Sequence, residues 1–519
     1  MNGPCFLGVD IGTYSSKGVL VDAGGRVLAS HVVPHELALP RPGWVEHDAD
    51  GVWWGDFVAI CQHVLAAGGV DPKAVAGVGV STISPCVLPV DGEGRPLRPG
   101  ILYGIDTRAT VEIGELERAI GADHLLARYG TKLSAQSTSP KIRWLRQHEP
   151  DVWRQTRLLL SGTGYVVYKL TGEATLDIYD AGAYAPLFDP QTLAWNPDVA
   201  DLVAPVELLP RLTWTCAVAG HVTRAAAQAT GLAAGTPVIT GTADAAAEAI
   251  SAGLAQVGDM MVMVGSSIYF IVKVDRLHPC DRFWPTHFLE ADTYAVTGGM
   301  STAGSLVRWF RDTLSPAEVA AEAAGGPNAY AALAALAATS PPGAHGLVVL
   351  PYFAGERTPL HDPDARGVVC GLTLTHTRAD LCRALLEAVG YGIRHNLDAL
   401  AAEGIVPRRI LAVGGGTQNS LWMELVSSIA GIEQHIPRQQ IGAAYGDAIL
   451  AAVGVGFFAD TAAGARWVQQ AQVIRPDPPA QAVYAAYYPL YRDLYQATAP
   501  VQHALSALQR AGVPGGRLP

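Results

Sequence analysis

The stretch Leu7-Gly8-Val9-Asp10-Ile11-Gly12-Thr13-Tyr14-Ser15-Ser16-Lys17-Gly18-Val19-Leu20-Val21 decides the fold. Two apolar runs flank a short polar turn, which predicts two antiparallel strands joined by a hairpin. Gly12 lets backbone amides approach an anion, and the hydroxyl residues and Lys17 add donors. Asp10 ends the first strand, where a hydrated Mg²⁺ could bridge its carboxylate and a phosphate. The alternative is a hairpin with a structural aspartate.

This turn joins two strands, and it lacks the G-x-x-x-x-G-K-[ST] pattern of a P-loop. It resembles the first phosphate loop of the actin-like ATPase fold. A second hairpin is predicted at 260–274, with the small, hydroxyl-rich apex Gly265-Ser266-Ser267. The repeat of the hairpin predicts a duplicated domain. The two loops together suit a triphosphate, because a triphosphate needs hydrogen-bond donors from both sides.

The chain of 519 residues is long enough for two large domains. Its 36 basic and 47 acidic residues give a net charge of −11, which argues against nucleic acid as a partner. The seven cysteines show no paired spacing and are typical of reduced thiols. No signal peptide or membrane span is predicted, so we expect a cytoplasmic protein; a homodimer stays open.

Apolar periodicity outlines the elements around these hairpins. An antiparallel meander is expected to about Ser30, and a helix from near Asp48. Strand 75–80 is expected to pair with 87–90, and strand 237–240 leads to a helix at Asp244. A tyrosine stripe near the C-terminus predicts a packed helix.

Asp244 is the candidate catalytic base. It follows Gly241-Thr242-Ala243 and precedes three alanines, so few side chains would block a ligand. A hydroxyl that attacks a γ-phosphate needs an oriented carboxylate to accept its proton. The alternative is an ordinary helix N-cap.

Further residues are candidates for ligand binding, and each has a structural role as its alternative. Gly414-Gly415-Gly416 ends a strand before a helix, which suits a nucleotide or a mobile loop. Asp106 could accept hydroxyls of a polyol, or form a salt bridge with Arg108. Glu356 and Arg357 are expected to form an ion pair that fixes a loop.

Together these runs resemble the FGGY family of carbohydrate kinases. The matching segments are Gly8-Val9-Asp10-Ile11-Gly12-Thr13, Pro42-Gly43-Trp44-Val45-Glu46-His47-Asp48, Leu97-Arg98-Pro99-Gly100-Ile101-Leu102, Tyr168-Lys169-Leu170-Thr171-Gly172, Gly355-Glu356-Arg357-Thr358-Pro359 and Gly414 to Asn419 with Trp422. The resemblance covers nearly the whole chain and is greatest to xylulokinases.

The resemblance implies an α/β protein of two ribonuclease-H-like domains, of the actin, hexokinase and Hsp70 type, around a central cleft. We place them at residues 1–248 and 249–519. It implies transfer of phosphate from ATP, with Mg²⁺, to a sugar or polyol. The implied roles are catalysis for Asp244, magnesium for Asp10, nucleotide binding for Gly12, Thr13, Lys17, Gly265, Ser266, Gly304, Gly415, Gly416 and Asn419, and sugar binding for Ser84, Asp106 and Asp244.

The expected substrate is a ketose, with D-xylulose first. Ser84-Pro85 stands where xylulokinases usually carry Met-His, and Gly164 replaces an aspartate, so ribulose, an L-ketose or erythritol are alternatives. The Arg-Glu pair of glycerol kinases is missing. A rival of another class is an actin-like ATP-binding scaffold without transfer activity.

Overall fold

The computed structural model describes residues 3–511, which form two compact units. Unit 1 contains the chain up to Val257 together with Lys273–Val296 and Gln439–Gln469. Unit 2 contains Gly258–Val272, Thr297–Arg438 and the chain from Gln470. The two units interleave along the sequence.

A mixed sheet forms the centre of unit 1, with strands in the order β13-β14-β5-β1-β2-β3 and β15 also paired to β5. The predicted meander is confirmed, and β5 runs parallel to β1. The strands are β1 (Cys5–Ile11), β2 (Ser15–Asp22), β3 (Val27–Pro34), β5 (Val75–Thr82), β13 (Val218–His221), β14 (Pro237–Ile239) and β15 (Thr242–Ala243).

One predicted strand pairing is wrong. Strand β6 (Leu88–Val90) pairs with β8 (Leu158–Leu160) and not with β5. The reason is that β5 already has β1 on one edge and β14 and β15 on the other, which leaves no edge for a further strand.

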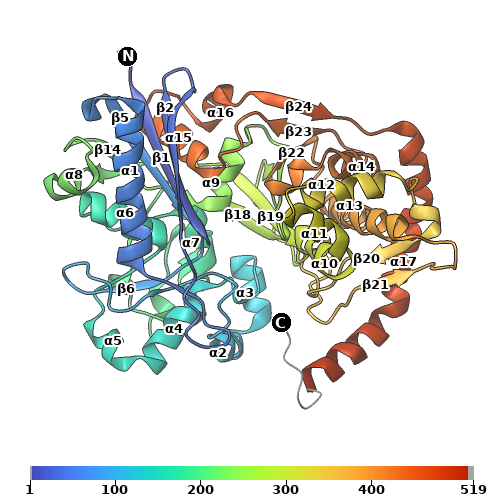
Figure 1. Cartoon of the computed structure of the whole chain (residues 1–519). Helices are drawn as coiled ribbons and strands as arrows, with labels where there is room; N and C mark the ends of the chain where they lie inside the picture. The colour runs from blue at the N-terminus through green and yellow to red at the C-terminus, as the bar shows by residue number, and fades with distance from the viewer. Residues whose placement is uncertain (1–2, 512–519) are drawn as a thin grey trace. The chain divides into compact units, whose positions relative to one another are not determined.

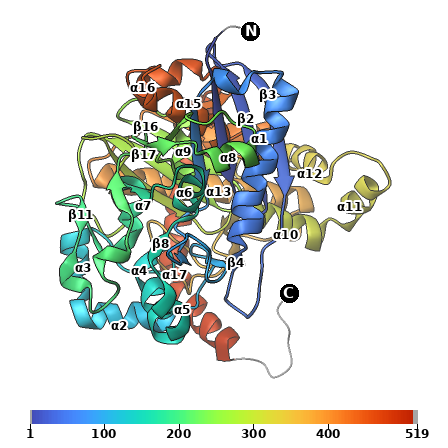
Figure 2. The same ribbon diagram turned by 90° about the vertical axis from the view of Figure 1, so that its left-hand side faces the viewer.

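Helices cover both faces of this sheet. Figure 1 shows α1 and α6 on one side of it, with α9 and α15 on the other, and Figure 2 shows α1 along β2 and β3. These helices are α1 (Gly55–Gly68), α6 (Gly162–Thr171), α9 (Asp244–Ser251) and α15 (Ala443–Gly454). Unit 1 also contains α2 (Thr110–Ile120), α3 (Ala122–Tyr129), α4 (Thr138–His148) and α5 (Pro150–Gln155).

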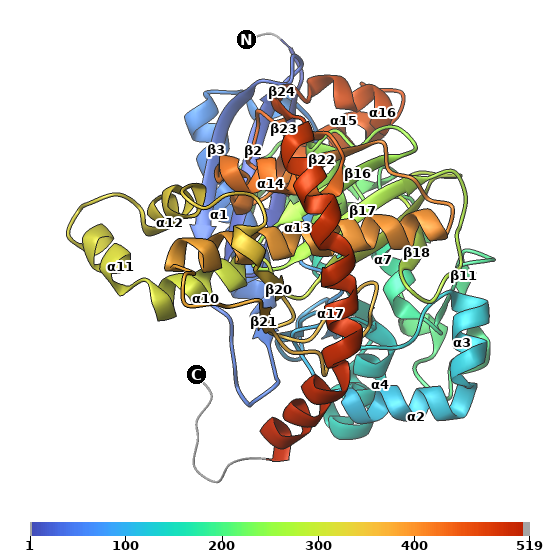
Figure 3. The same ribbon diagram turned by 90° about the vertical axis from the view of Figure 1, so that its right-hand side faces the viewer.

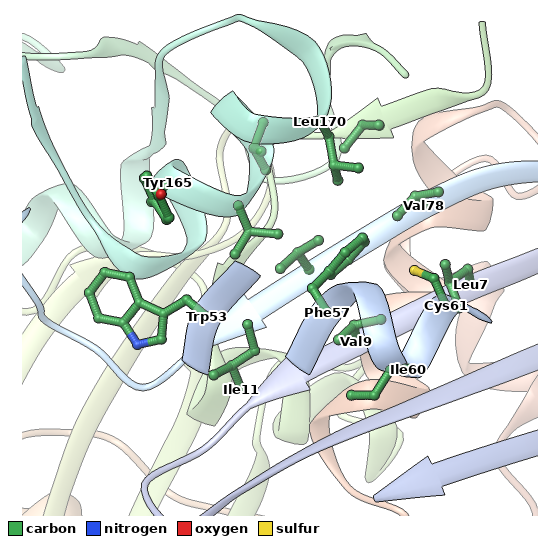
Figure 4. Packing of buried hydrophobic residues seen from close by; sticks show 14 of the residues in the cluster. Leu7, Val9, Ile11, Trp53, Phe57, Ile60, Cys61, Val78, Tyr165 and Leu170 are labelled. Carbon is green, nitrogen blue, oxygen red and sulfur yellow. The ribbon is translucent and has the colours of Figure 1, made fainter. Parts of the chain in front are cut away.

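The face of the sheet toward α1 is apolar. Leu7, Val9 and Ile11 of β1 pack with Phe57 and other buried side chains of α1, as Figure 4 shows. Because side chains alternate along a strand, the residues between them, Gly8 and Asp10, lie on the opposite face. The alternation therefore separates a hydrophobic core on one side of β1 from polar chemistry on the other.

A second sheet, centred in unit 2, has the order β18-β19-β17-β16-β22-β23-β24, and its strands from β19 to β24 repeat the strand order of unit 1. The predicted second hairpin is β16 and β17, and β22 runs parallel to β16. These strands are β16 (Asp259–Val264), β17 (Ile268–Val274), β18 (Trp284–His287), β19 (Tyr294–Met300), β22 (Arg409–Val413), β23 (Gln434–Pro437) and β24 (Gln470–Ile474). Both sheets confirm the expected α/β class.

Helices pack on the sheet of unit 2, and the C-terminal helix lies against them. In Figure 3, α17 runs past α13 and α14. Tyr491 of α17 stacks on Tyr391 of α13, which confirms that the tyrosine stripe is packing. The helices are α10 (Gly304–Leu314), α11 (Pro316–Ala323), α12 (Ala329–Ala338), α13 (Arg378–Ala402), α14 (Ser420–Ala430) and α17 (Pro478–Ala511).

The seven cysteines are free thiols. Within residues 3–511, none of the helices combines the length and the apolar character that a bilayer crossing requires.

Candidate active site

The register of the sheet in unit 1 brings polar residues together at the carboxyl ends of its parallel strands. Asp10 of β1 is the register partner of Ser81 on β5, and Ser81 is in turn the partner of Thr242 on β15. On the other side, Asp10 pairs with Lys17 of β2. Ligands of open α/β sheets bind at this edge, so the strand pairing alone places Asp10 and Asp244 at a candidate active site.

Asp244 is the first residue of α9, directly after β15, as the sequence predicted. Its carboxylate oxygen Oδ1 accepts a hydrogen bond of 2.7 Å from the amide of Ala245. Burial raises the pKa of Asp244 well above its usual range, and the charge of Asp10 adds to this shift. The Asp244 carboxylate therefore has a higher affinity for a proton than an exposed aspartate has. A general base uses this affinity when it accepts the proton of the attacking hydroxyl.

Asp10 is almost fully buried, with 7% of its surface exposed. Burial raises its pKa to about 6, against the opposing effect of the Lys17 ammonium and of a hydrogen bond from Ser81. Lys17 is the register partner of Asp10, so its side chain lies on the same face of the sheet. A cation beside Asp10 would relieve the cost of its buried charge.

Glu248 is an acid of this site that sequence reasoning missed. It lies one turn after Asp244 on α9, and burial and the charge of Asp10 raise its pKa to about 7. The i, i+4 spacing of Asp244 and Glu248 was a signal that could have found it.

The raised pKa of Glu248 predicts a pH-dependent stability. Between its ordinary pKa of 4.5 and about 7, the folded chain binds more protons at Glu248 than the unfolded chain, so the free energy of unfolding falls as pH rises. Glu248→Gln removes this loss. The difference in free energy of unfolding between the variant and the wild type should rise by on the order of 2 kcal/mol from about pH 5 to pH 8. Urea unfolding without metal or nucleotide measures this difference at each pH. An equal difference at both pH values would contradict the assignment.

Packing of α15 against the sheet brings a further acid to this edge. A Cβ on Gly8 would lie 2.0 Å from the carbonyl oxygen of Ala444, and one on Gly79 would lie 2.2 Å from that of Asp447. Likewise, a Cβ on Gly446 would lie 1.9 Å from the carbonyl oxygen of Ala247 in α9. Only glycine permits these approaches. Asp447 is thereby placed beside Ser81, with its Oδ2 oxygen 2.7 Å from the Ser81 hydroxyl oxygen.

The turn between β1 and β2 is held by its neighbours. The amide of Gly12 donates to the carbonyl of Ser15 over 3.0 Å, and the Thr13 hydroxyl lies 3.2 Å from that of Tyr103. His47 bonds the carbonyl of Thr13 through Nε2, and burial lowers its pKa to about 4, so the ring is neutral near pH 7. The turn therefore has a fixed shape.

Ser84 hydrogen-bonds to Asp180, a second residue that the sequence analysis missed. Burial raises the pKa of Asp180 to about 6. Nearby, Asp177 accepts hydrogen bonds from the hydroxyls of Thr215 and Thr242, at 2.9 and 2.7 Å, and so fixes the strand that leads into Asp244. Ser84 and Asp180 provide polar groups that a sugar hydroxyl can bind.

Asp106 is the residue for which the structure differs from the expected sugar-binding role. Its side chain has no exposed surface, and its two carboxylate oxygens accept hydrogen bonds from the Arg108 guanidinium at 2.7 to 3.0 Å. The amide of Val45 donates to Oδ2 over 2.7 Å. The salt-bridge alternative is therefore correct: the carboxylate is occupied by the protein, and we no longer expect it to bind substrate.

The predicted nucleotide loops of unit 2 do come together. The carbonyl of Gly265 accepts from the amide of Gly304 over 2.9 Å, which joins the β16–β17 turn to the start of α10. The carbonyl of Ser266 accepts from Ala303 and Ser305, at 2.9 and 3.0 Å. A Cβ on Gly416 would lie 2.3 Å from Val264, at the end of β16.

Beside these contacts, a Cβ on Gly415 would meet nothing within 4 Å. Its backbone is therefore accessible to a flat ligand. Asn419 accepts a hydrogen bond of 3.1 Å from the amide of Trp422 and so caps α14. The loops offer a glycine-lined surface where the sequence predicted nucleotide binding.

The expected ion pair between Glu356 and Arg357 takes another form. Glu356 accepts from the amides of Ser301 and Arg357, and the guanidinium of Arg357 donates to the carbonyls of Ile268 and Met300. Each side chain bonds to backbone groups, which keeps the predicted structural role.

Comparison with known proteins shows which family and which proteins this chain resembles. Residues 5–251 match the model of the N-terminal domain, and residues 260–455 that of the C-terminal domain, of the FGGY family of carbohydrate kinases. The xylulose kinase of Klebsiella pneumoniae is 30% identical, over 96% of this chain and 99% of its own length. A glycerol kinase of Nocardia farcinica is 29% identical, over 87% and 90%.

Among solved structures, the xylulose kinase of Rhodospirillum rubrum superimposes with a TM-score of 0.89 at 33% identity. The match covers 96% of this chain and all of the other.

Proposed function

As the chain belongs to the FGGY family of carbohydrate kinases, we propose that it transfers the γ-phosphate of ATP to a primary hydroxyl of a ketose, D-xylulose first of all. The observation that carries this proposal is the position of Asp244 at the start of α9, at the edge of the sheet that also holds Asp10 and Ser81. The xylulose kinases among its relatives support the choice of substrate.

In the proposed reaction, Asp244 orients the attacking hydroxyl and accepts its proton as the new O–P bond forms and the bond to ADP breaks. Gly12, Thr13 and Lys17 of the first hairpin bind phosphate oxygens. Gly265, Ser266, Gly304, Gly415, Gly416 and Asn419 of unit 2 bind the rest of the nucleotide.

The acids of unit 1 fit a Mg²⁺ ion that arrives with the nucleotide. Among residues 3–511, no group of three or more His, Cys, Asp and Glu side chains forms a metal cage. Mg²⁺ usually keeps several waters and binds through one or two carboxylates and the phosphates, so Asp10 suffices as its anchor. When bound, the ion neutralises charge on the phosphates.

Ser84 and Asp180 are proposed to bind the sugar. Where xylulokinases usually carry Met-His, this chain has a hydroxyl bonded to a carboxyl group. This change favours a broader choice of ketose or polyol, and ribulose, an L-ketose and erythritol are the alternatives. A site that hydrogen-bonds a substrate hydroxyl rejects an analogue without it by a large factor.

Product analysis tests the reaction type. After incubation with ATP, Mg²⁺ and D-xylulose, phosphorus NMR should show ADP and a phosphate ester on the primary C5 oxygen. Free phosphate in place of the ester would show hydrolysis alone and contradict the proposed transfer.

A further inference from the structure

Asp447 is the one acid in the buried stretch 443–452 of α15, whose other residues are small or apolar apart from Tyr445. Its side chain is completely buried. Oxygen Oδ2 lies 2.7 Å from the Ser81 hydroxyl oxygen, and Oδ1 has no hydrogen-bond partner within the described chain. A buried carboxyl oxygen without a partner costs stability, so packing gives no reason for an acid here.

Ser81 connects Asp447 to Asp10. Its hydroxyl oxygen lies 3.3 Å from Oδ1 of Asp10 as well as 2.7 Å from Asp447. A serine hydroxyl has one proton and cannot donate to both carboxyl groups at once. Both hydrogen bonds form when Asp447 carries a proton and donates to Ser81, while Ser81 donates to Asp10.

The surroundings of Asp447 agree with this arrangement. Burial raises the pKa of Asp447 well above its usual range, and the charges of Asp10 and Asp244 add to the shift. The close approach of α15 to Gly8 and Gly79 leaves its backbone little room to move. Ser81 and Asp447 are therefore held on two rigid elements, strand β5 and helix α15.

We propose that Asp447 is a positioning residue, which acts through Ser81 to orient the carboxylate of Asp10 toward a nucleotide-bound Mg²⁺. The inference rests on the proposed function, because it assigns Asp10 to the magnesium of that reaction. Partners of this kind typically change metal affinity by about 10- to 100-fold when they are lost.

The test compares Asp447→Ala, Asp447→Asn and the control Tyr445→Phe. Tyr445 is buried on the same helix, and its hydroxyl bonds the carbonyls of Gly25 and Trp467, away from Asp10. For each protein, calorimetry measures ADP affinity with and without Mg²⁺, and kinetics measure the Mg²⁺ half-saturation and the KM for D-xylulose.

Asp447→Ala should reduce the gain in ADP affinity that Mg²⁺ provides and raise the Mg²⁺ half-saturation, each by about 10-fold. The KM for D-xylulose should change by less than about 3-fold, since Asp447 touches no proposed sugar-binding group. Asp447→Asn should recover most of the Mg²⁺ response, because its amide can donate to Ser81.

An unchanged Mg²⁺ response in Asp447→Ala, or an equal change in Tyr445→Phe, would overturn the proposal. If Asp447→Ala does not fold, Ser81→Ala removes the hydroxyl that connects Asp447 to Asp10 and should give the same loss of Mg²⁺ response. A wild-type protein inactive on every sugar would contradict the proposed function, while the calorimetry would still decide the role of Asp447.

Discussion

Asp244→Asn is expected to lower kcat for phosphoryl transfer by at least ~10²-fold, with the fold and ADP binding retained. The amide keeps the size of the carboxyl group and can still accept from Ala245, but it cannot take the proton of the attacking hydroxyl. Steady-state ADP release with saturating ATP and D-xylulose measures the effect, and circular dichroism checks the fold.

Ser251→Ala is the matched control for this variant. Ser251 is buried on the same helix and donates to the carbonyl of Glu248 over 2.8 Å, so it tests general damage to α9. A normal kcat in a folded Asp244→Asn protein would remove Asp244 from the mechanism.

The second large effect concerns stability. Asp106→Ala should lower the free energy of unfolding by about 3 kcal/mol, because it leaves Arg108 buried without one of its two acidic partners. Arg108 also faces Glu46 at 2.8 Å and lies over Trp44, 4.1 Å from the ring centroid. Urea unfolding at neutral pH measures the loss.

Asp91→Ala gives the comparison, since its salt bridge with Arg95 lies at the surface and should contribute much less. The folded fraction of Asp106→Ala should bind D-xylulose with nearly the wild-type KM. A stable protein with a large rise in KM would return Asp106 to the sugar site.

The elements closest to the hairpin could be predicted from the sequence because their interactions are local. The run from Leu7 to Val21 contains both strands, the turn and the polar residues on one face of β1. The same holds for Asp244, since the small residues around it mark the end of a strand and the start of a helix.

The rest depends on contacts between distant parts of the chain. Ser81 and Asp447 are 366 positions apart, and Ser84 and Asp180 are 96 apart, so no local pattern relates them. A single signal did exist for Asp447, as the one acid between small and apolar residues in Gly446-Asp447-Ala448. For Asp106, the neighbouring Arg108 left two alternatives, and the burial of the carboxylate together with its hydrogen bonds from Arg108 and Val45 decided between them.

The identity of the acceptor tests the central claim most directly. ADP release should be measured with ATP and Mg²⁺ over a panel of pentuloses, hexuloses, polyols and glycerol. The account predicts that ketoses stimulate release, D-xylulose with the highest kcat/KM. Preference for glycerol over every ketose would contradict the proposed substrate class, and a panel in which no sugar or polyol stimulates release would favour an ATP-binding scaffold.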